Sequence, residues 1–183
     1  MVKYSDFSEA DKSIIQTLSN EMLDWKIIDI HDMNDVNGLY ACTIEDSKER
    51  AIIAYRGSEK MYEVKSFIQD WMRADFALLN SRCTRQQEAA AQYVDMLWEK
   101  GILKKYPTVY FTGHSLGGNL ATHTTIAMAQ EGRNEGLWEN IKGCVNFDGP
   151  GFSEAYLIEH DEKIKKASSK ITHFKWSAVS LLY

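Results

Sequence analysis

Apolar residues form short extended runs in the first third of the chain, and helical stretches separate such runs in the remainder. Three runs rich in β-branched and aromatic residues occupy positions 25–30, 40–44 and 51–55. The first two flank a segment that contains Asn-Gly, a dipeptide typical of hairpin turns, so we expect them to pair antiparallel. A helix is expected over positions 8–22, because a serine can cap its first turn and acidic residues follow at once.

The period of the apolar residues changes to that of a helix from position 84 onward. Between positions 84 and 101, apolar side chains recur on one helical face, and a glycine ends the stretch. The rest of the chain predicts, in order, a strand at 108–111, a helix at 116–130, a strand at 141–147, a helix at 153–166 and a strand at 171–176. Strands that alternate with helices at this spacing are typical of βαβ units and a parallel sheet. The predicted fold class is therefore α/β with an antiparallel lead-in.

The length of 183 residues fits one domain, since a domain of roughly 150 residues is ordinary. Hydrophobic residues make up 44% of the chain and charged residues 26%, which is average globular usage. With no linker or repeat in view, we interpret positions 1–183 as a single domain. No apolar run approaches the ~18 residues of a membrane-spanning helix, and acidic residues stand where a secretory signal has its apolar core. These features favour a cytoplasmic location.

The net charge and the cysteines exclude further classes. A formal charge of −5 argues against a nucleic-acid-binding protein, because phosphate binding needs clustered positive charge. Cys42, Cys83 and Cys144 are odd in number and far apart, which suits neither a disulfide framework nor a metal site. We therefore expect free thiols and no bound metal.

The strongest chemical signal is the segment Gly113-His114-Ser115-Leu116-Gly117, which matches the G-x-S-x-G pattern. It follows a strand-like run and opens an apolar helix, so a sharp strand-to-helix turn would push the serine hydroxyl outward. Glycines are needed there because side chains on both sides of the serine would collide with neighbouring backbone. An ordinary glycine-rich turn is the alternative interpretation. Adjacent residues point in opposite directions, so His114 should lie beneath the turn and is not expected to act as a base.

Several segments extend this pattern into a family resemblance. Positions 52–59 (IIAYRGSE), 111–121 (FTGHSLGGNLA) and 145–152 (VNFDGPGF) carry it, and positions 86–93 (QQEAAAQY) fit the helix that precedes the nucleophile strand. The chain resembles the class 3, or fungal-type, lipase superfamily, in particular its bacterial lipase-like branch. The resemblance implies an α/β-hydrolase-like domain with a mostly parallel sheet and helices on both faces.

The resemblance also implies site residues and a reaction. Ser115 corresponds to the nucleophile and the backbone N–H of Leu116 to one oxyanion donor, while Ser58 supplies a second donor through its amide or hydroxyl. The implied reaction is hydrolysis of a carboxylic ester through an acyl-enzyme, on a small ester or a lipid, without a metal or an organic cofactor. A capping role in a loop is the alternative interpretation of Ser58.

The chain departs from the family where the acid and the base of the triad are expected. The strand at 171–176 runs into Ser177 with no carboxylate in reach. Asp148 is the best remaining acid because it ends the strand next to the nucleophile strand, although Asp-Gly-Pro-Gly is also ordinary turn chemistry. His173 is the histidine in the right chain order for a base, but its place inside a strand also fits a structural role. Both assignments stay open at this point.

The final residues, SAVSLLY, are apolar to the end, whereas chain ends are usually polar. We therefore expect a domain that lacks its last strand and helix, with an exposed sheet edge that invites pairing with a second copy. The incomplete triad leaves a second hypothesis beside the ester hydrolase, namely a catalytically inactive hydrolase-fold module that acts in binding or assembly.

Overall fold

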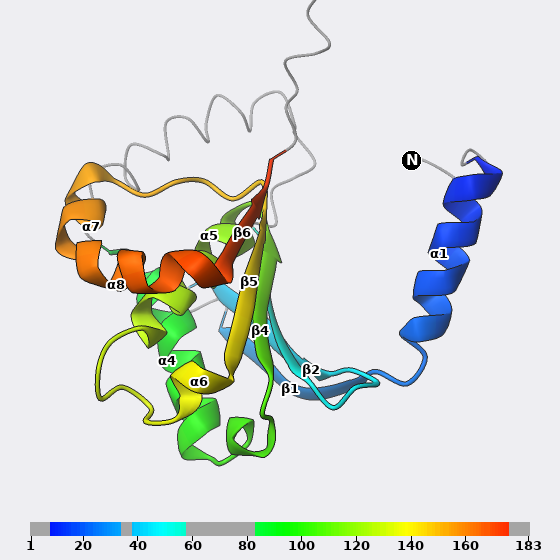
Figure 1. The fold of residues 1–183 in the computed structure, drawn as a ribbon, viewed down its shortest axis with the longest axis horizontal. Coiled ribbons are helices and arrows are strands. Elements are labelled where there is room, and N and C mark those ends of the chain that lie inside the picture. Colours follow the sequence, from blue (N-terminus) through cyan, green and yellow to red (C-terminus); the bar gives the residue numbers. More distant parts are fainter. Residues whose placement is uncertain (1–7, 34–37, 58–82, 176–183) are drawn as a thin grey trace, which may run out of the picture.

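The computed structural model describes residues 8–33, 38–57 and 83–175, and Figure 1 shows its sheet almost edge-on. Six strands follow one another across the sheet in chain order: β1 (Lys26–Met33), β2 (Leu39–Glu45), β3 (Ala51–Tyr55), β4 (Val109–His114), β5 (Ile141–Phe147) and β6 (Ile171–Phe174). The strands β1 to β3 pair antiparallel, and β3 to β6 pair parallel. The predicted α/β class with its antiparallel lead-in is confirmed. β6 is an edge of the described sheet. The pairing of this edge with a second copy of the chain stays a prediction.

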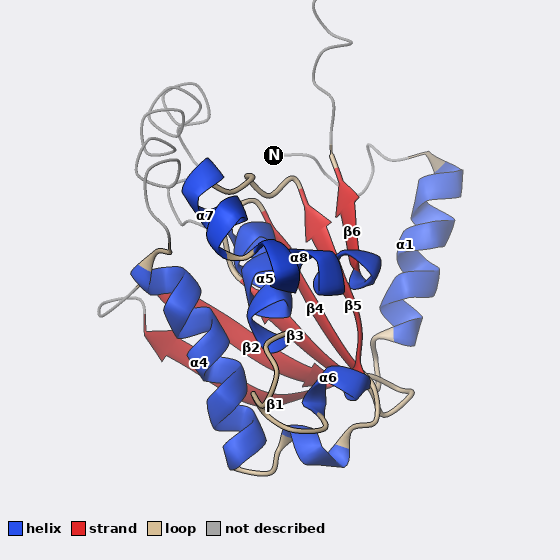
Figure 2. Ribbon diagram, turned by 60° about the vertical axis from the view of Figure 1, so that its left-hand side comes forward, coloured by secondary structure: helices blue, strands red, loops and turns tan. Residues whose placement is uncertain are grey.

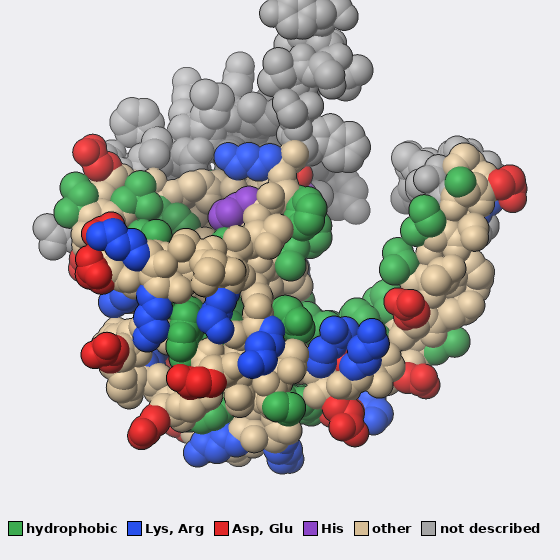
Figure 3. Space-filling view, in the orientation of Figure 1, with side chains coloured by type: hydrophobic (Ala, Val, Ile, Leu, Met, Phe, Trp, Pro, Cys, Tyr) green, Lys and Arg blue, Asp and Glu red, His purple; other side chains and the backbone are tan. Residues whose placement is uncertain are grey.

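The helices lie on both sides of the sheet, but only one face is closely covered. They are α1 (Glu9–Glu21), α4 (Arg85–Glu99), α5 (Leu116–Met128), α6 (Leu137–Asn140), α7 (Glu154–Glu159) and α8 (Asp161–Ala167), with 3-10 turns at Leu103–Lys105 and Ser168–Lys170. Figures 1 and 2 show α4 to α8 on one face of the sheet, while α1 stands apart on the side of the other face. Hydrophobic side chains gather on the side of α1 that faces the body (Figure 3). Ile14 and Leu18 in α1 are exposed, as is Met22 directly after it. Within the described ranges, no helix has both the length and the apolar character needed to cross a membrane.

The strands predicted at 108–111 and 141–147 are parallel neighbours, as expected, and α5 joins them. β4 is longer than the predicted run, because it continues through Gly113 and His114 up to the turn. Every residue of α5 from Gly117 to Met128 is buried, since this helix contacts the sheet as well as α4 and α8. The serine of the G-x-S-x-G segment therefore stands at the start of the central helix of the fold.

The main core lies between the sheet and the helices α4 and α5. Buried residues alternate along β2, β3 and β4 with partly exposed ones, so one face of each strand points to the helices. The core includes Leu39, Ala41, Ile53, Val94, Leu97, Val109, Phe111 and Leu120. On the opposite face, Phe147 is 44% exposed and Phe174 is 55% exposed, and their rings stack with centroids 5.4 Å apart.

The single helix predicted at 153–166 is divided into α7 and α8. His160 has φ −109° and ψ 13°, which is not helical, and it ends α7 and precedes α8. Its ring stacks on that of Tyr156 with centroids 4.2 Å apart, and Asp161 and Glu162 then supply the acidic first turn of α8. The prediction of one helix was wrong because the periodicity of polar and apolar residues continues across a change of direction in the backbone.

Candidate active site

Ser115 alone makes the turn from β4 to α5. Its backbone has φ 55° and ψ −130°, in the left-handed region that non-glycine residues rarely adopt. The N–H of Ser115 donates to the carbonyl of Phe147 at 2.8 Å, and its own carbonyl accepts from Gly118 N–H at 2.8 Å. These two hydrogen bonds hold Ser115 between β5 and the first turn of α5.

Two glycines allow the tight junction around Ser115. A side chain at Gly113 would collide with the backbone of Gly117, and one at Gly117 would collide with the carbonyl oxygen of Tyr55. Each obstacle is main chain, which cannot rotate away as the end of a flexible side chain can. The glycines of the motif therefore let α5 start directly against the ends of β3 and β4.

The chain that leaves β3 passes beside Ser115. A Cβ atom added to Gly57 would lie 2.9 Å from the carbonyl oxygen of His114 and 3.6 Å from Cβ of Ser115. Leu116 is the first residue of α5, where the N–H groups of a helix have no intrahelical acceptor. Ser58 lies outside the described residues, so its oxyanion role stays a prediction, as does that of Leu116.

Asp148 is brought to the same edge of the sheet as Ser115. It follows β5 directly, and the preceding residue, Phe147, is the one whose carbonyl accepts from Ser115 N–H. The N–H of Asp148 donates to the carbonyl of Phe174 at 2.8 Å, and its φ of 52° is left-handed. The exposed carboxylate therefore stands at the carboxyl ends of the parallel strands, and its role as the acid stays a prediction.

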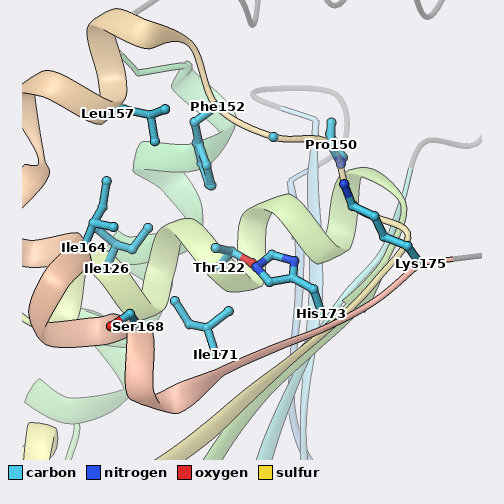
Figure 4. A pocket seen from close by; sticks show the side chains of 12 residues that line it. Thr122, Ile126, Pro150, Phe152, Leu157, Ile164, Ser168, Ile171, His173 and Lys175 are labelled. Atoms are coloured by element: carbon cyan, nitrogen blue, oxygen red, sulfur yellow. The ribbon is translucent and has the colours of Figure 1, made fainter.

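His173 is placed away from the Ser115 turn. It pairs with Asn146, which pairs with Gly113, so its Cα lies two interstrand spacings, roughly 10 Å, from that of Gly113. Figure 4 shows its imidazole pointing toward Thr122, two helical turns beyond Ser115. Within the described part of the chain, the Ser115 hydroxyl makes no hydrogen bond with a histidine.

His114 does not lie beneath the turn as expected from alternation. It is exposed, and it shares its register position with Phe147 and Phe174 on the open face of the sheet. The expectation was wrong because no described helix covers that face beside β4. Its side chain still points away from the helices, which agrees with its exclusion as the base.

A buried polar network beneath the turn was not predicted from the sequence. Asn119, in the first turn of α5, accepts from Gln87 Nε2 at 2.8 Å through its Oδ1 and donates to the carbonyls of Pro150 and Gly151 at 3.1 Å each. Asn146 Nδ2 donates to Thr122 Oγ1 at 2.9 Å, and the Asn146 Oδ1 accepts from Gly149 N–H at 2.8 Å. The sequence signals that could have indicated this network are an asparagine in a buried strand and another in an apolar helix. The network fastens the 149–151 turn to α5.

A second buried cluster surrounds His123 in α5. Its Nδ1 lies 2.7 Å from the Tyr156 hydroxyl, and its Nε2 lies 3.9 Å from Sγ of Cys83. Burial lowers the pKa of His123 to about 3 and raises the pKa of the Cys83 thiol to about 11. At neutral pH the cluster therefore holds a neutral imidazole and a protonated thiol, which suits packing rather than nucleophilic chemistry.

The described residues bring no group of three His, Cys, Asp or Glu side chains together in a way that could hold a metal ion. The three cysteines are free, with Cys144 buried in the core and the other two partly buried. Among the described residues, Ser115, Leu116 and Asp148 lie at the carboxyl ends of the parallel strands.

A family model described as Mbeg1-like matches residues 21–179, which is most of the chain. The chain belongs to the Mbeg1-like family. The match takes in all six strands and the whole neighbourhood of Ser115. No curated protein sequence matches this Mbeg1-like chain.

Solved lipase structures share the fold of the Mbeg1-like chain. The M37 lipase has a TM-score of 0.58 and 16% sequence identity over 90% of this chain and 59% of its own. A triacylglycerol lipase from Penicillium expansum has a TM-score of 0.54 and 16% identity over 83% and 59% of the two chains. Lipase II from Rhizopus niveus has a TM-score of 0.52 and 13% identity over 90% and 64%. The chain thus spans about three-fifths of these lipases, and the likeness shows an α/β-hydrolase-like fold.

Proposed function

We propose that this Mbeg1-like protein is a serine hydrolase that cleaves carboxylic esters, with Ser115 as the nucleophile. The observation that carries the proposal is the left-handed backbone of Ser115 at a one-residue junction between β4 and α5. Strain of this kind persists only where the surrounding structure imposes it, and it is concentrated at functional sites. The fold shared with lipases supports the same class of reaction.

The proposed reaction proceeds through an acyl-enzyme. Ser115 Oγ forms a bond to the ester carbonyl carbon, and the carbonyl π electrons move to the oxygen, where the N–H of Leu116 stabilises the negative charge. Collapse of this intermediate breaks the bond to the alcohol, which leaves with the proton from Ser115. Water then attacks the acyl group, releases the carboxylic acid and returns a proton to Ser115.

The acid and base assignments differ in the support that the geometry gives them. Asp148 lies beside the residue that accepts from Ser115 N–H, so it stands at the same edge of the sheet as Ser115. The His173 ring points toward Thr122 (Figure 4), which does not favour direct proton transfer from Ser115. We therefore keep Asp148 as the acid of the proposal and expect little contribution from His173.

The second hypothesis, an inactive hydrolase-fold module, draws support from the orientation of His173. Without a base on its hydroxyl, a serine is an ordinary alcohol, and only the weak catalysis of the oxyanion donors and the binding site remains. In this hypothesis the Ser115 junction serves only to connect β4 to α5, and the protein acts by binding a partner or by assembly.

A fluorophosphonate probe tests the nucleophile directly. We expect covalent labelling of the purified protein, complete loss of labelling in Ser115→Ala, and unchanged labelling in Ser47→Ala, which alters an exposed serine between β2 and β3. Intact-mass spectrometry should show one probe per chain. A wild-type protein that stays unlabelled under conditions that label a reference esterase would favour the inactive module.

Turnover of p-nitrophenyl butyrate tests the base. We expect a slow rate that falls at least about tenfold in Ser115→Ala, because the acyl-enzyme can no longer form. His173→Ala should keep the wild-type rate, since the ring of His173 points toward Thr122 in the wild type. Fast turnover that is abolished by His173→Ala would contradict this prediction and would make His173 the base.

A further inference from the structure

A cavity of about 520 Å³ opens beside the central helix, at a place separate from Ser115. Its walls come from α5, α7, α8, β6 and the turn at 149–152, and the site residues Ser115, Leu116 and Asp148 do not line it. Small-molecule sites commonly have volumes of roughly 300–1,000 Å³. The cavity therefore has the size of a ligand site.

One end of the cavity is aliphatic and aromatic. Figure 4 shows Ile126, Phe152, Leu157, Ile164 and Ile171 gathered around this end. A second, smaller core consists of Ile126, Ala129, Tyr156 and Ala167, and the cavity residues Phe152, Ile164 and Ile171 pack against it. An occupant with a hydrocarbon chain would extend this core and remove apolar surface from water.

The other end of the cavity carries positive charge and a ring nitrogen. Figure 4 shows the His173 ring pointing toward Thr122 and the Lys175 side chain reaching toward Pro150. The described residues that line the cavity include no acidic side chain, so these residues place no like charge beside an anion. The cationic end and the apolar end together define an amphiphilic site.

We propose that this cavity binds an aliphatic carboxylate, with its hydrocarbon chain at the apolar end and its carboxylate at Lys175. The ammonium group supplies the charge that a carboxylate needs, and His173 offers a further hydrogen-bonding group beside it. Each methylene added to the ligand should tighten binding about fourfold until the apolar end is full. The site does not use Ser115, so it is independent of the proposed hydrolysis.

Binding is measured on Ser115→Ala by isothermal titration calorimetry, so that no turnover takes place. The ligands are octanoate, decanoate and dodecanoate, with methyl dodecanoate and 1-dodecanol as uncharged controls, all below their micellar concentrations. We expect one site per chain, affinity that rises along the carboxylate series, and weaker binding of both uncharged ligands. Absence of saturable binding, or equal affinity for dodecanoate and 1-dodecanol, would overturn the proposal.

Two matched pairs of variants locate the ligand. Leu157 lines the cavity and is 46% exposed, whereas its neighbour Ile158 is 72% exposed and does not line it. Leu157→Trp should block dodecanoate, and Ile158→Trp should bind it as before. The exposed position of Leu157 makes its substitution compatible with folding, which circular dichroism verifies.

The second pair concerns charge. Lys175→Met should weaken dodecanoate binding about fivefold while leaving 1-dodecanol unchanged, because the lost contact is partly exposed to solvent. Lys100→Met, at the exposed end of α4, should leave both affinities unchanged. If Leu157→Trp binds like Ile158→Trp, or Lys175→Met binds dodecanoate like Lys100→Met, the ligand lies elsewhere and the assignment is wrong. Loss of hydrolysis in the Ser115 experiments has no bearing on these outcomes.

Discussion

Replacing Gly117 by alanine is expected to destabilise the protein by about 3 kcal/mol or more, which places it among the most damaging single substitutions in this fold. The added Cβ would collide with the carbonyl oxygen of Tyr55 and lie 2.9 Å from the Tyr55 carbonyl carbon and 3.0 Å from that of Arg56. All three atoms are main chain at the end of β3. The start of α5 must therefore move off the sheet, and the Ser115 junction moves with it.

The matched control for this substitution is Gly151→Ala. A Cβ at Gly151 meets no atom of the described residues within 4 Å, and this glycine does not have a left-handed φ. Its substitution should change stability by no more than about 0.5 kcal/mol. Urea unfolding followed by tryptophan fluorescence compares the two variants with the wild type. Equal midpoints for Gly117→Ala and the wild type would mean that the close approach of α5 to β3 is not needed.

The antiparallel first pair of strands, the parallel neighbours β4 and β5 and the turn between β4 and α5 could be predicted from the sequence because their causes are local. The glycines at 113 and 117 mark a place where side chains cannot fit, and the apolar run that follows marks a buried helix. The alternation of strands and helices then leaves few ways to arrange the sheet. The placement of Asp148 at the same edge follows from this topology, since the carboxyl ends of parallel strands lie together.

The side-chain contacts around the turn could not be predicted, because they depend on register and on helix rotation. Gln87 and Asn119 lie on different helices, and their hydrogen bond of 2.8 Å exists only because α4 and α5 pack side by side. The distance between His173 and the Ser115 turn likewise follows from the pairing of His173 with Asn146, which chain order does not reveal. The break at His160 depends on the backbone of one residue.

Acid is expected to weaken the folded state through His123. Burial in α5, together with smaller electrostatic contributions from His160, Arg133 and Lys163, lowers the pKa of this imidazole from 6.5 to about 3. As the pH falls below 6.5, the unfolded chain binds a proton on His123 that the folded protein does not bind until about pH 3. Stability is therefore fully present above pH 6.5 and falls as the pH drops, by on the order of 4 kcal/mol at pH 3.

The contribution of His123 is isolated by comparing two substitutions across pH. His123→Gln removes the titrating ring from its place 2.7 Å from the Tyr156 hydroxyl, so the loss of stability between pH 6.5 and 4 should become shallower by about 1 kcal/mol per pH unit. His173→Gln alters an exposed histidine and should keep the wild-type slope. Carboxylates also titrate in this pH range, but they change the stability of all three proteins alike. The difference in slope between His123→Gln and the other two proteins is therefore due to His123. Urea unfolding at pH 7, 6, 5 and 4 measures these slopes, and a His123→Gln slope equal to that of the wild type would show that His123 takes up its proton in the folded state.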